Sequence, residues 1–364
     1  MHIYKQQRII FFDYLRIFSI LAMIMLHVSA GGVMDYPVGS VEWEICNVYD
    51  SMVRWCVPVF VMISGALFLG RDVSMRNVYK KNILRLAVAY VVWCVVYYVS
   101  DSSNDIIPCL KDIVCHPSTF IYVLSERKFH LWFLPMLIGL YMSIPILKSI
   151  AQNTSARKHF VCLSLFFMFV VTFVSVLVNA VSLSEETLSL IHLRTLIDGT
   201  IVKIQPEVLA CYACYFILGY YLNKCMIINK RRMIVYLLGI MGYVMTVYFT
   251  RRYSLCTSTL TEQFYGYNTI NVCFLSMAIF VFFKYSSFSY NKFYRKVIVK
   301  LSNYSFGAYL IHILWLEFLR SVHIDALHFS PSYAVPVVTI VIAVLSYASS
   351  AILNQIPIIK KYVV

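Results

Sequence analysis

Arg16 and His27 lie within one apolar stretch of the sequence, residues 9–30, and their types and spacing could support group-transfer chemistry. An ionisable side chain in hydrocarbon costs several kcal/mol unless it faces a polar interior, so such residues indicate function. The two residues are eleven positions apart, about 16 Å and close to three turns of a helix, so both point to the same side. Histidine can act as a general base near neutral pH, and arginine can bind phosphate oxygens as a permanent cation. One helix could therefore hold an anion and a proton acceptor at different depths.

The composition indicates which elements position these residues. Of the 364 residues, 60% are hydrophobic and only 13% are charged, so the chain is predicted to be an integral membrane protein. Apolar runs near 20 residues favour helices over the alternating strands of a membrane barrel. No charged or Gly/Pro-rich linker divides residues 1–364, so a single all-α domain, a polytopic bundle, is expected. Ten spans are predicted, at about 9–30, 48–70, 83–100, 131–150, 160–182, 207–222, 233–250, 268–283, 304–320 and 333–353.

The distribution of Lys and Arg predicts the orientation of these spans. With the N-terminus in the cytoplasm, the inner segments hold 20 Lys and Arg residues and the outer loops hold 8. Both termini are therefore expected to be cytoplasmic, with Arg16 near the cytoplasmic face and His27 in the outer half. This bias accounts for the net charge of +14 without nucleic acid, and it is compatible with a polyanionic cytoplasmic ligand. The 11 cysteines show no repeated metal-ligand spacing, so no metal is expected, although Cys109 and Cys115 share an outer loop and could form a disulfide.

Several predicted spans carry short motifs in addition to the Arg–His pair. The motifs are Arg54-Trp-Cys-Val-Pro58-Val-Phe60 with Ser64-Gly65, Asn82-Ile-Leu-Arg85-Leu, His130-Leu-Trp132-Phe133-Leu134, Gly219-Tyr-Tyr-Leu, and Ser302-Asn-Tyr-Ser305-Phe306-Gly-Ala-Tyr309-Leu-Ile-His312. Each motif alone is a loose pattern in an apolar helix, but their order within a ten-helix frame is specific. In these features, over most of its length, the chain resembles the short members of the acyltransferase-3 family of integral membrane acyltransferases.

The resemblance implies an O-acyltransferase that moves an acetyl or similar short acyl group from cytoplasmic acyl-CoA to a hydroxyl of a cell-surface or lipid-linked glycan. It also implies a multi-pass protein of the bacterial cytoplasmic membrane, with acyl-CoA as the donor substrate and no permanently bound cofactor. In this reaction His27 would be the general base and Arg16 would bind the donor. Arg85 could contact a donor phosphate, or it could reflect only the cytoplasmic excess of positive charge.

Three residues on the outer side are candidates for acceptor binding. Arg54 lies in the outer part of its span, where it could pair with an acid or contact the glycan. His130 and Trp132 begin the fourth span, and Trp132 could instead be an interfacial anchor. Glu317, an acid within the ninth span, needs a partner.

Supporting roles are expected for four further residues. Asp13 could pair with Arg16 and orient it. Ser64, together with the glycine that follows it, could allow close packing of helices, or it could contact substrate. Tyr309 and His312 share one helix face, where His312 could be a second acid–base group or a buried hydrogen-bond partner.

Two other classes of function are open on the sequence alone. A secondary transporter or flippase for a sugar or lipid-linked sugar could also use ten helices with buried charges. Such proteins typically contain inverted repeats with paired broken helices, and residues 1–180 and 181–364 show no convincing repeat. A non-catalytic partner in polysaccharide synthesis would tolerate loss of His27. The oligomeric state is also open, because lipid-facing and partner-facing apolar surfaces look alike.

Overall fold

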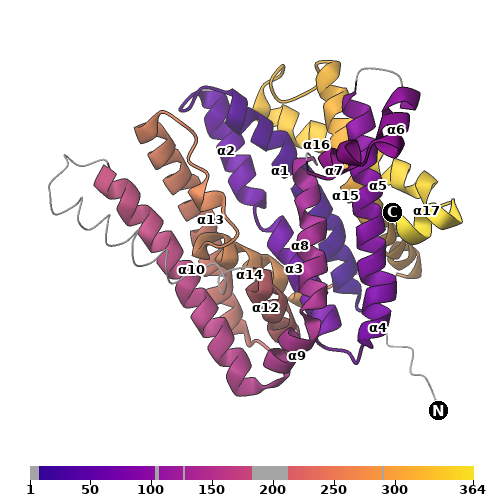
Figure 1. The fold of residues 1–364 in the computed structure, drawn as a ribbon. Helices are drawn as coiled ribbons and strands as arrows, with labels where there is room; N and C mark the ends of the chain where they lie inside the picture. Colours follow the sequence, from indigo (N-terminus) through magenta and orange to yellow (C-terminus); the bar gives the residue numbers. More distant parts are fainter. Residues whose placement is uncertain (1–7, 103–105, 126–127, 183–211, 289–290) are drawn as a thin grey trace, which may run out of the picture.

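The computed structural model of the chain describes residues 8–102, 106–125, 128–182, 212–288 and 291–364 (Figure 1). These residues form helices and short connections and contain no strand. Eight helical segments of the described part are long and apolar enough to cross a membrane, and a bent pair of helices brings the number to nine. The all-α, polytopic architecture predicted from the sequence is therefore confirmed.

The helices follow one another along the described chain. They are α1 (Ile10–Asp35), α2 (Val41–Val53), α3 (Cys56–Phe68), α4 (Met75–Asn77), α5 (Leu84–Asp101), α6 (Ile106–Cys115), α7 (Pro117–Ser125), α8 (Phe133–Met142), α9 (Ile144–Gln152), α10 (Thr154–Ser182), α12 (Tyr212–Lys224), α13 (Asn229–Thr257), α14 (Ile270–Tyr285), α15 (Lys292–Ser321), α16 (Pro331–Leu353) and α17 (Pro357–Tyr362). A π-helical turn, Val78–Ile83, joins α4 to α5, and a 3₁₀ turn, Phe129–Trp132, precedes α8.

Nine of the ten predicted spans coincide with these membrane-length segments. The second predicted span corresponds to α2 and α3 in series, and the third to α4 and α5. The sixth, residues 207–222, differs. Its first five residues lie outside the described residues, and from Tyr212 onward the span is helical, as α12. The described residues contain eight or nine membrane-length segments, and both the total of ten spans and the orientation of the termini stay predictions.

A sharp bend of 61° separates α8 from α9 within the fourth predicted span. Pro145 is the second residue of α9 and has no N–H to donate to the preceding turn. The Ser143 hydroxyl donates to the Gly139 carbonyl at 2.9 Å, which satisfies an acceptor at the end of α8. The proline therefore explains why one apolar run forms two helices.

The close approach of α3 and α12 depends on two glycines. A Cβ atom on Gly65 would lie 1.8 Å from the Phe216 carbonyl oxygen, and one on Gly219 would lie 2.0 Å from that of Met62. No real Cβ could occupy either position, so the two backbones pack directly against each other. The sequence predicted close helix packing at Ser64 and Gly65, and the structure confirms it at Gly65, where α3 meets α12.

The disulfide considered between Cys109 and Cys115 is wrong. Both residues lie in the single helix α6, and both are free cysteines. Six residues of helix correspond to a rise of about 9 Å, whereas disulfide-bonded Cα atoms are rarely more than about 7 Å apart. The helical structure of this segment, which the sequence suggested to be a loop, therefore separates the two thiols.

Several helices that surround α1 line one cavity. The helix α1 packs against α2, α3, α15 and α16, while α5 packs against α8 and α17. The cavity is lined by residues of α1, α3, α5, α8 and α15, together with Asn82 of the π-helical turn, Asn354 after α16 and Lys360 of α17. Figure 1 shows α17 beside α5, so the last described residues also reach this region.

Candidate functional site

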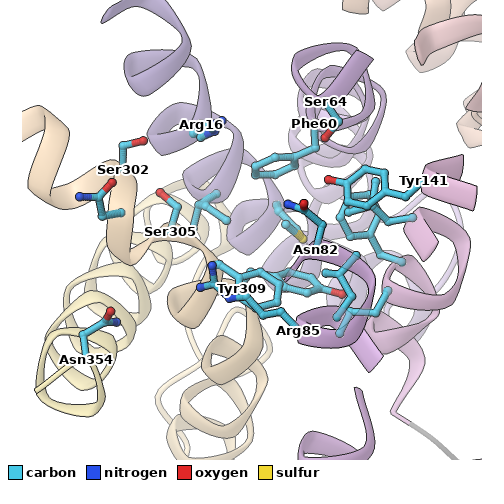
Figure 2. Close-up of a pocket in the computed structure, with 18 of the residues that line it drawn as sticks. Arg16, Phe60, Ser64, Asn82, Arg85, Tyr141, Ser302, Ser305, Tyr309 and Asn354 are labelled. Carbon is cyan, nitrogen blue, oxygen red and sulfur yellow. The ribbon is translucent and has the colours of Figure 1, made fainter. Parts of the chain in front are cut away.

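The larger cavity has a volume of about 490 Å³ and lies between these helices (Figure 2). Its apolar wall comes mainly from α1, α3 and α8. Figure 2 shows polar side chains that approach the cavity from several helices, and these include Ser64, Asn82, Tyr141, Ser302, Ser305 and Asn354. The cavity therefore combines hydrogen-bonding groups from several helices with apolar walls.

The charges around this cavity are all positive. Arg16, Arg85 and Lys360 line it, and none of the described residues that line it is acidic. A cavity lined by cations and by no acidic residue favours an anionic ligand, and a guanidinium can bind a phosphate through two hydrogen bonds. The structure thus places the two arginines assigned to the donor in one cavity and adds Lys360, which the sequence suggested only as a topology signal.

Asp13 supports Arg16 less directly than expected. Its carboxylate is 1% exposed and accepts hydrogen bonds from Arg8 at 2.6 and 2.8 Å and from the Ser302 hydroxyl at 2.7 Å. The nearest Arg16 nitrogen lies 3.6 Å away, an ion pair without a hydrogen bond. Asp13 therefore joins α1 to α15 primarily, and the Arg16 guanidinium keeps its donors for the cavity.

Arg85 is held by the C-terminal segment. Its Nη2 donates to the Val364 carbonyl, and its guanidinium lies 5.0 Å from the centroid of the Phe306 ring. Its Nε is buried without a hydrogen-bond partner among the described residues. The indole of Trp93 donates to the Val363 carbonyl at 3.1 Å, so two side chains of α5 fix the same stretch of backbone. This arrangement leaves donor capacity on Arg85 at the cavity.

A second, smaller cavity of about 30 Å³ contains the predicted base. His27, His130 and Trp132 line it. Four residues line both cavities, and we call them the collar: Met23, Phe60, Phe133 and Tyr309. The cavity that holds Arg16 and the cavity that holds His27 therefore adjoin each other and share the collar as a common wall.

Three histidines from different elements form a cluster, and two of them, His27 and His130, line the smaller cavity. The ring centroid of His312 lies 5.2 Å from that of His27 and 5.3 Å from that of His130. His130 is 2% exposed, and neither of its ring nitrogens has a hydrogen-bond partner among the described residues. The Tyr309 hydroxyl donates to the His130 carbonyl at 2.7 Å and fixes its backbone. The cluster can therefore accept and donate protons in an otherwise apolar environment.

Trp132 closes the smaller cavity with other aromatic rings. Its ring centroid lies 5.5 Å from that of Tyr212 and 6.1 Å from that of Tyr267. Trp132 thus packs within the protein at the cavity, which distinguishes it from an anchor that faces only lipid headgroups.

Arg54 has an acidic partner, and Glu317 has a basic one. Arg54 forms an ion pair with the fully buried Asp50, and its guanidinium lies 3.9 Å from the centroid of the Tyr265 ring. It lines neither cavity. The acid partner considered for Arg54 is therefore present, and the structure does not bring Arg54 to the cavity surface. Glu317 accepts a hydrogen bond from Lys128 at 2.6 Å.

These features define a class of protein: an all-α polytopic membrane protein in which a basic cavity adjoins a histidine cluster. The family model of the acyltransferase domain, that of acyltransferase family 3, matches residues 9–354. The chain therefore belongs to this family and is a membrane acyltransferase, as the motifs indicated. No curated protein and no solved structure matches the chain.

Proposed function

We propose that this acyltransferase transfers an acetyl or similar short acyl group from cytoplasmic acyl-CoA to a hydroxyl of a cell-surface or lipid-linked glycan. It would act in the bacterial cytoplasmic membrane. The observation that carries this proposal is the position of the collar, which joins a cavity lined by three cations to a cavity lined by two histidines. A polyanionic donor and a proton-transfer step require these two environments side by side.

The donor would bind in the larger cavity. Coenzyme A carries phosphate groups, and Arg16, Arg85 and Lys360 can each contribute a charge-assisted hydrogen bond to them. The apolar walls beyond these cations suit the extended, uncharged arm that carries the thioester. This pose directs the acyl group toward His27, about 16 Å further along α1 from Arg16 by helix geometry.

His27 would remove the proton from the acceptor hydroxyl at the smaller cavity. The hydroxyl oxygen then attacks the thioester carbonyl carbon, a new C–O bond forms, and the C–S bond breaks. The proton on His27 returns to the leaving sulfur, so the products are the glycan ester and the free thiol of coenzyme A. A general base positioned in this way contributes typically 10²–10⁴-fold to the rate, by an order-of-magnitude estimate.

The test compares surface glycans from cells that carry the wild-type chain, His27→Ala or Arg16→Ala. Ester groups are measured by mass spectrometry and NMR, and the membrane content of each protein is measured by immunoblot. Both substitutions are expected to remove most of the esters, since one removes the base and the other a donor contact. Wild-type ester levels with a correctly inserted His27→Ala protein would contradict the assignment of His27.

A matched control is Arg157→Ala. The Arg157 guanidinium donates to the Ala151 carbonyl at 2.6 Å and lies outside both cavities. It is predicted to be cytoplasmic like Arg16, so it controls for loss of a positive charge at that face. Ester levels should remain close to wild type in this variant.

A further inference from the structure

The collar is a continuous set of bulky side chains between the two cavities. Its three aromatic rings are in contact in series: the centroids of Phe60 and Phe133 lie 6.2 Å apart, and those of Phe133 and Tyr309 lie 5.8 Å apart. Met23 of α1 completes it. The four residues come from α1, α3, α8 and α15, so the wall that the two cavities share depends on the packing of four helices.

The collar has one firmly fixed member and one adaptable member. Tyr309 is 4% exposed, and the hydrogen bond from its hydroxyl to the His130 carbonyl prevents the ring from turning away. Met23 is 5% exposed and is unbranched, so its side chain can adjust more easily than the rings. An acyl group that reaches His27 must therefore pass three rings whose positions are set by contacts with one another.

The space beyond the collar is small. Its volume is about 30 Å³, compared with about 490 Å³ on the side of the arginines. The smaller cavity is therefore much more confined than the larger one and suits a short group rather than a long acyl chain. An acetyl group has three non-hydrogen atoms, and a butyryl group has two more carbons. The walls are close-packed, and packing extra carbons into such a site is unfavourable.

We propose that the collar and the space beyond it select the acyl group by length, with Phe60 and Phe133 as the residues that determine this specificity. The inference rests on the proposed function, because it requires an acyl thioester to bind in the larger cavity. Acetyl fits between the collar and His27, whereas butyryl does not place its carbonyl carbon at the same position. Each excess methylene is expected to reduce transfer by about 10–200-fold.

The experiment uses inside-out membrane vesicles from cells that make the full chain and the glycan. The vesicles receive either [¹⁴C]acetyl-CoA or [¹⁴C]butyryl-CoA, and alkali-labile label in the glycan fraction is counted. Wild type should transfer acetyl at least about 100-fold faster than butyryl. Phe60→Ala should lower this ratio by about tenfold or more, because the cavity gains the volume of a ring. Phe133→Leu, which retains an apolar side chain in α8, should lower it in the same direction.

The matched control is Phe68→Ala. Phe68 lies two turns from Phe60 in α3 and is also half-buried, but its ring packs against Tyr141 at 4.6 Å and lines neither cavity. The ratio should be unchanged in this variant. The role of the collar is overturned if wild type transfers acetyl and butyryl equally. It is also overturned if Phe60→Ala and Phe133→Leu both keep the wild-type ratio of acetyl to butyryl transfer. In both of these outcomes acetyl is still transferred, so the proposed function stands. If wild-type vesicles incorporate no label from either donor, the proposed function is overturned as well.

Discussion

His27 and His312 stack with their ring centroids 5.2 Å apart, although they belong to α1 and α15. The Tyr309 carbonyl lies 2.5 Å from Nδ1 of His312, and a carbonyl can only accept, so Nδ1 carries a hydrogen and Nε2 keeps a lone pair. This Nε2 atom is buried and has no hydrogen-bond partner among the described residues. His312 therefore offers an available proton acceptor within the histidine cluster.

Replacement of His312 by Ala is expected to lower kcat for acyl transfer with little change in the donor KM. The reason is that His312 contributes to proton transfer at the smaller cavity but lines no part of the donor cavity. The loss should be smaller than the about 10²–10⁴-fold expected for His27→Ala, which removes the base itself. The measurement is steady-state transfer from radiolabelled acetyl-CoA in inside-out vesicles.

A partial rescue distinguishes this role from a purely structural one. His312→Asn keeps a donor for the Tyr309 carbonyl and should recover protein stability, but it should not recover kcat. His159→Ala, at an exposed position on α10, is the control for loss of an imidazole. A donor KM that rises in parallel with the loss of kcat would be inconsistent with the assignment.

Lys360 and Lys361 form a matched pair for testing the basic cavity. Lys360 lines the cavity, whereas Lys361 lies 4.7 Å from the centroid of the Tyr362 ring and does not line it. Lys360→Ala is expected to raise the donor KM by about tenfold or more, since a hydrogen bond to a charged group contributes about 1.5–3 kcal/mol. Lys361→Ala should leave it nearly unchanged. Equal effects of the two substitutions on KM would refute a direct contact between Lys360 and the donor.

The relationships that the sequence can indicate rest on local patterns. The spacing of Arg16 and His27 predicts two positions on one face of a helix, and the structure places them in adjoining cavities. Asp50 and Arg54 are four residues apart, a spacing that favours an ion pair on a helix, and it could have indicated the partner of Arg54. Such relationships depend only on the geometry of one element.

The features that sequence reasoning missed depend on contacts between distant segments. His27 and His312 are far apart in the chain, and no local period connects them. Lys360 follows the last predicted span and looked like one more cytoplasmic charge, because the sequence does not show that α17 lies against α5. Phe60 and Phe133 belong to two of the sequence motifs, but neither motif shows that the two rings lie against each other.

Gly65→Ala is expected to destabilise the protein strongly. A methyl group at this position would overlap the backbone carbonyl of Phe216, which cannot move without displacing α12. Overpacking in a close-packed interior costs typically about 1–3 kcal/mol, and a backbone contact should place the cost at or above the upper end. The measurement is the Tm of the detergent-solubilised protein.

Gly139→Ala provides the control for the same substitution in a helix. A Cβ atom at Gly139 would meet nothing within 4 Å, and alanine favours helix by about 0.5–1 kcal/mol over glycine. Its Tm should equal or exceed that of wild type. A Gly65→Ala protein as stable as wild type would show that α3 and α12 can separate at little cost.

Lys128 anchors the turn that carries His130 by joining two carboxylates. Its Nζ lies 2.8 Å from Asp101 and 2.6 Å from Glu317, at the ends of α5 and α15 respectively. Burial lowers the pKa of Lys128, but hydrogen bonds from the ammonium to the two carboxylates outweigh it and raise the pKa above its ordinary value. The stabilisation from this charge is therefore fully present below the unfolded pKa of about 10.4 and is lost only as the pH rises through the higher folded value.

Lys128→Met is consequently expected to lower kcat by the same factor at every pH between about 6 and 9, because the anchor stays charged over this range. Both carboxylates are partly exposed, so water screens the pair and the loss should not exceed about 1 kcal/mol, or about fivefold. The kcat of both proteins is measured across this range, with Lys111→Met on α6, an exposed lysine, as the control. A kcat ratio that changes with pH would show that a group titrating near neutrality, rather than Lys128, holds the turn in place.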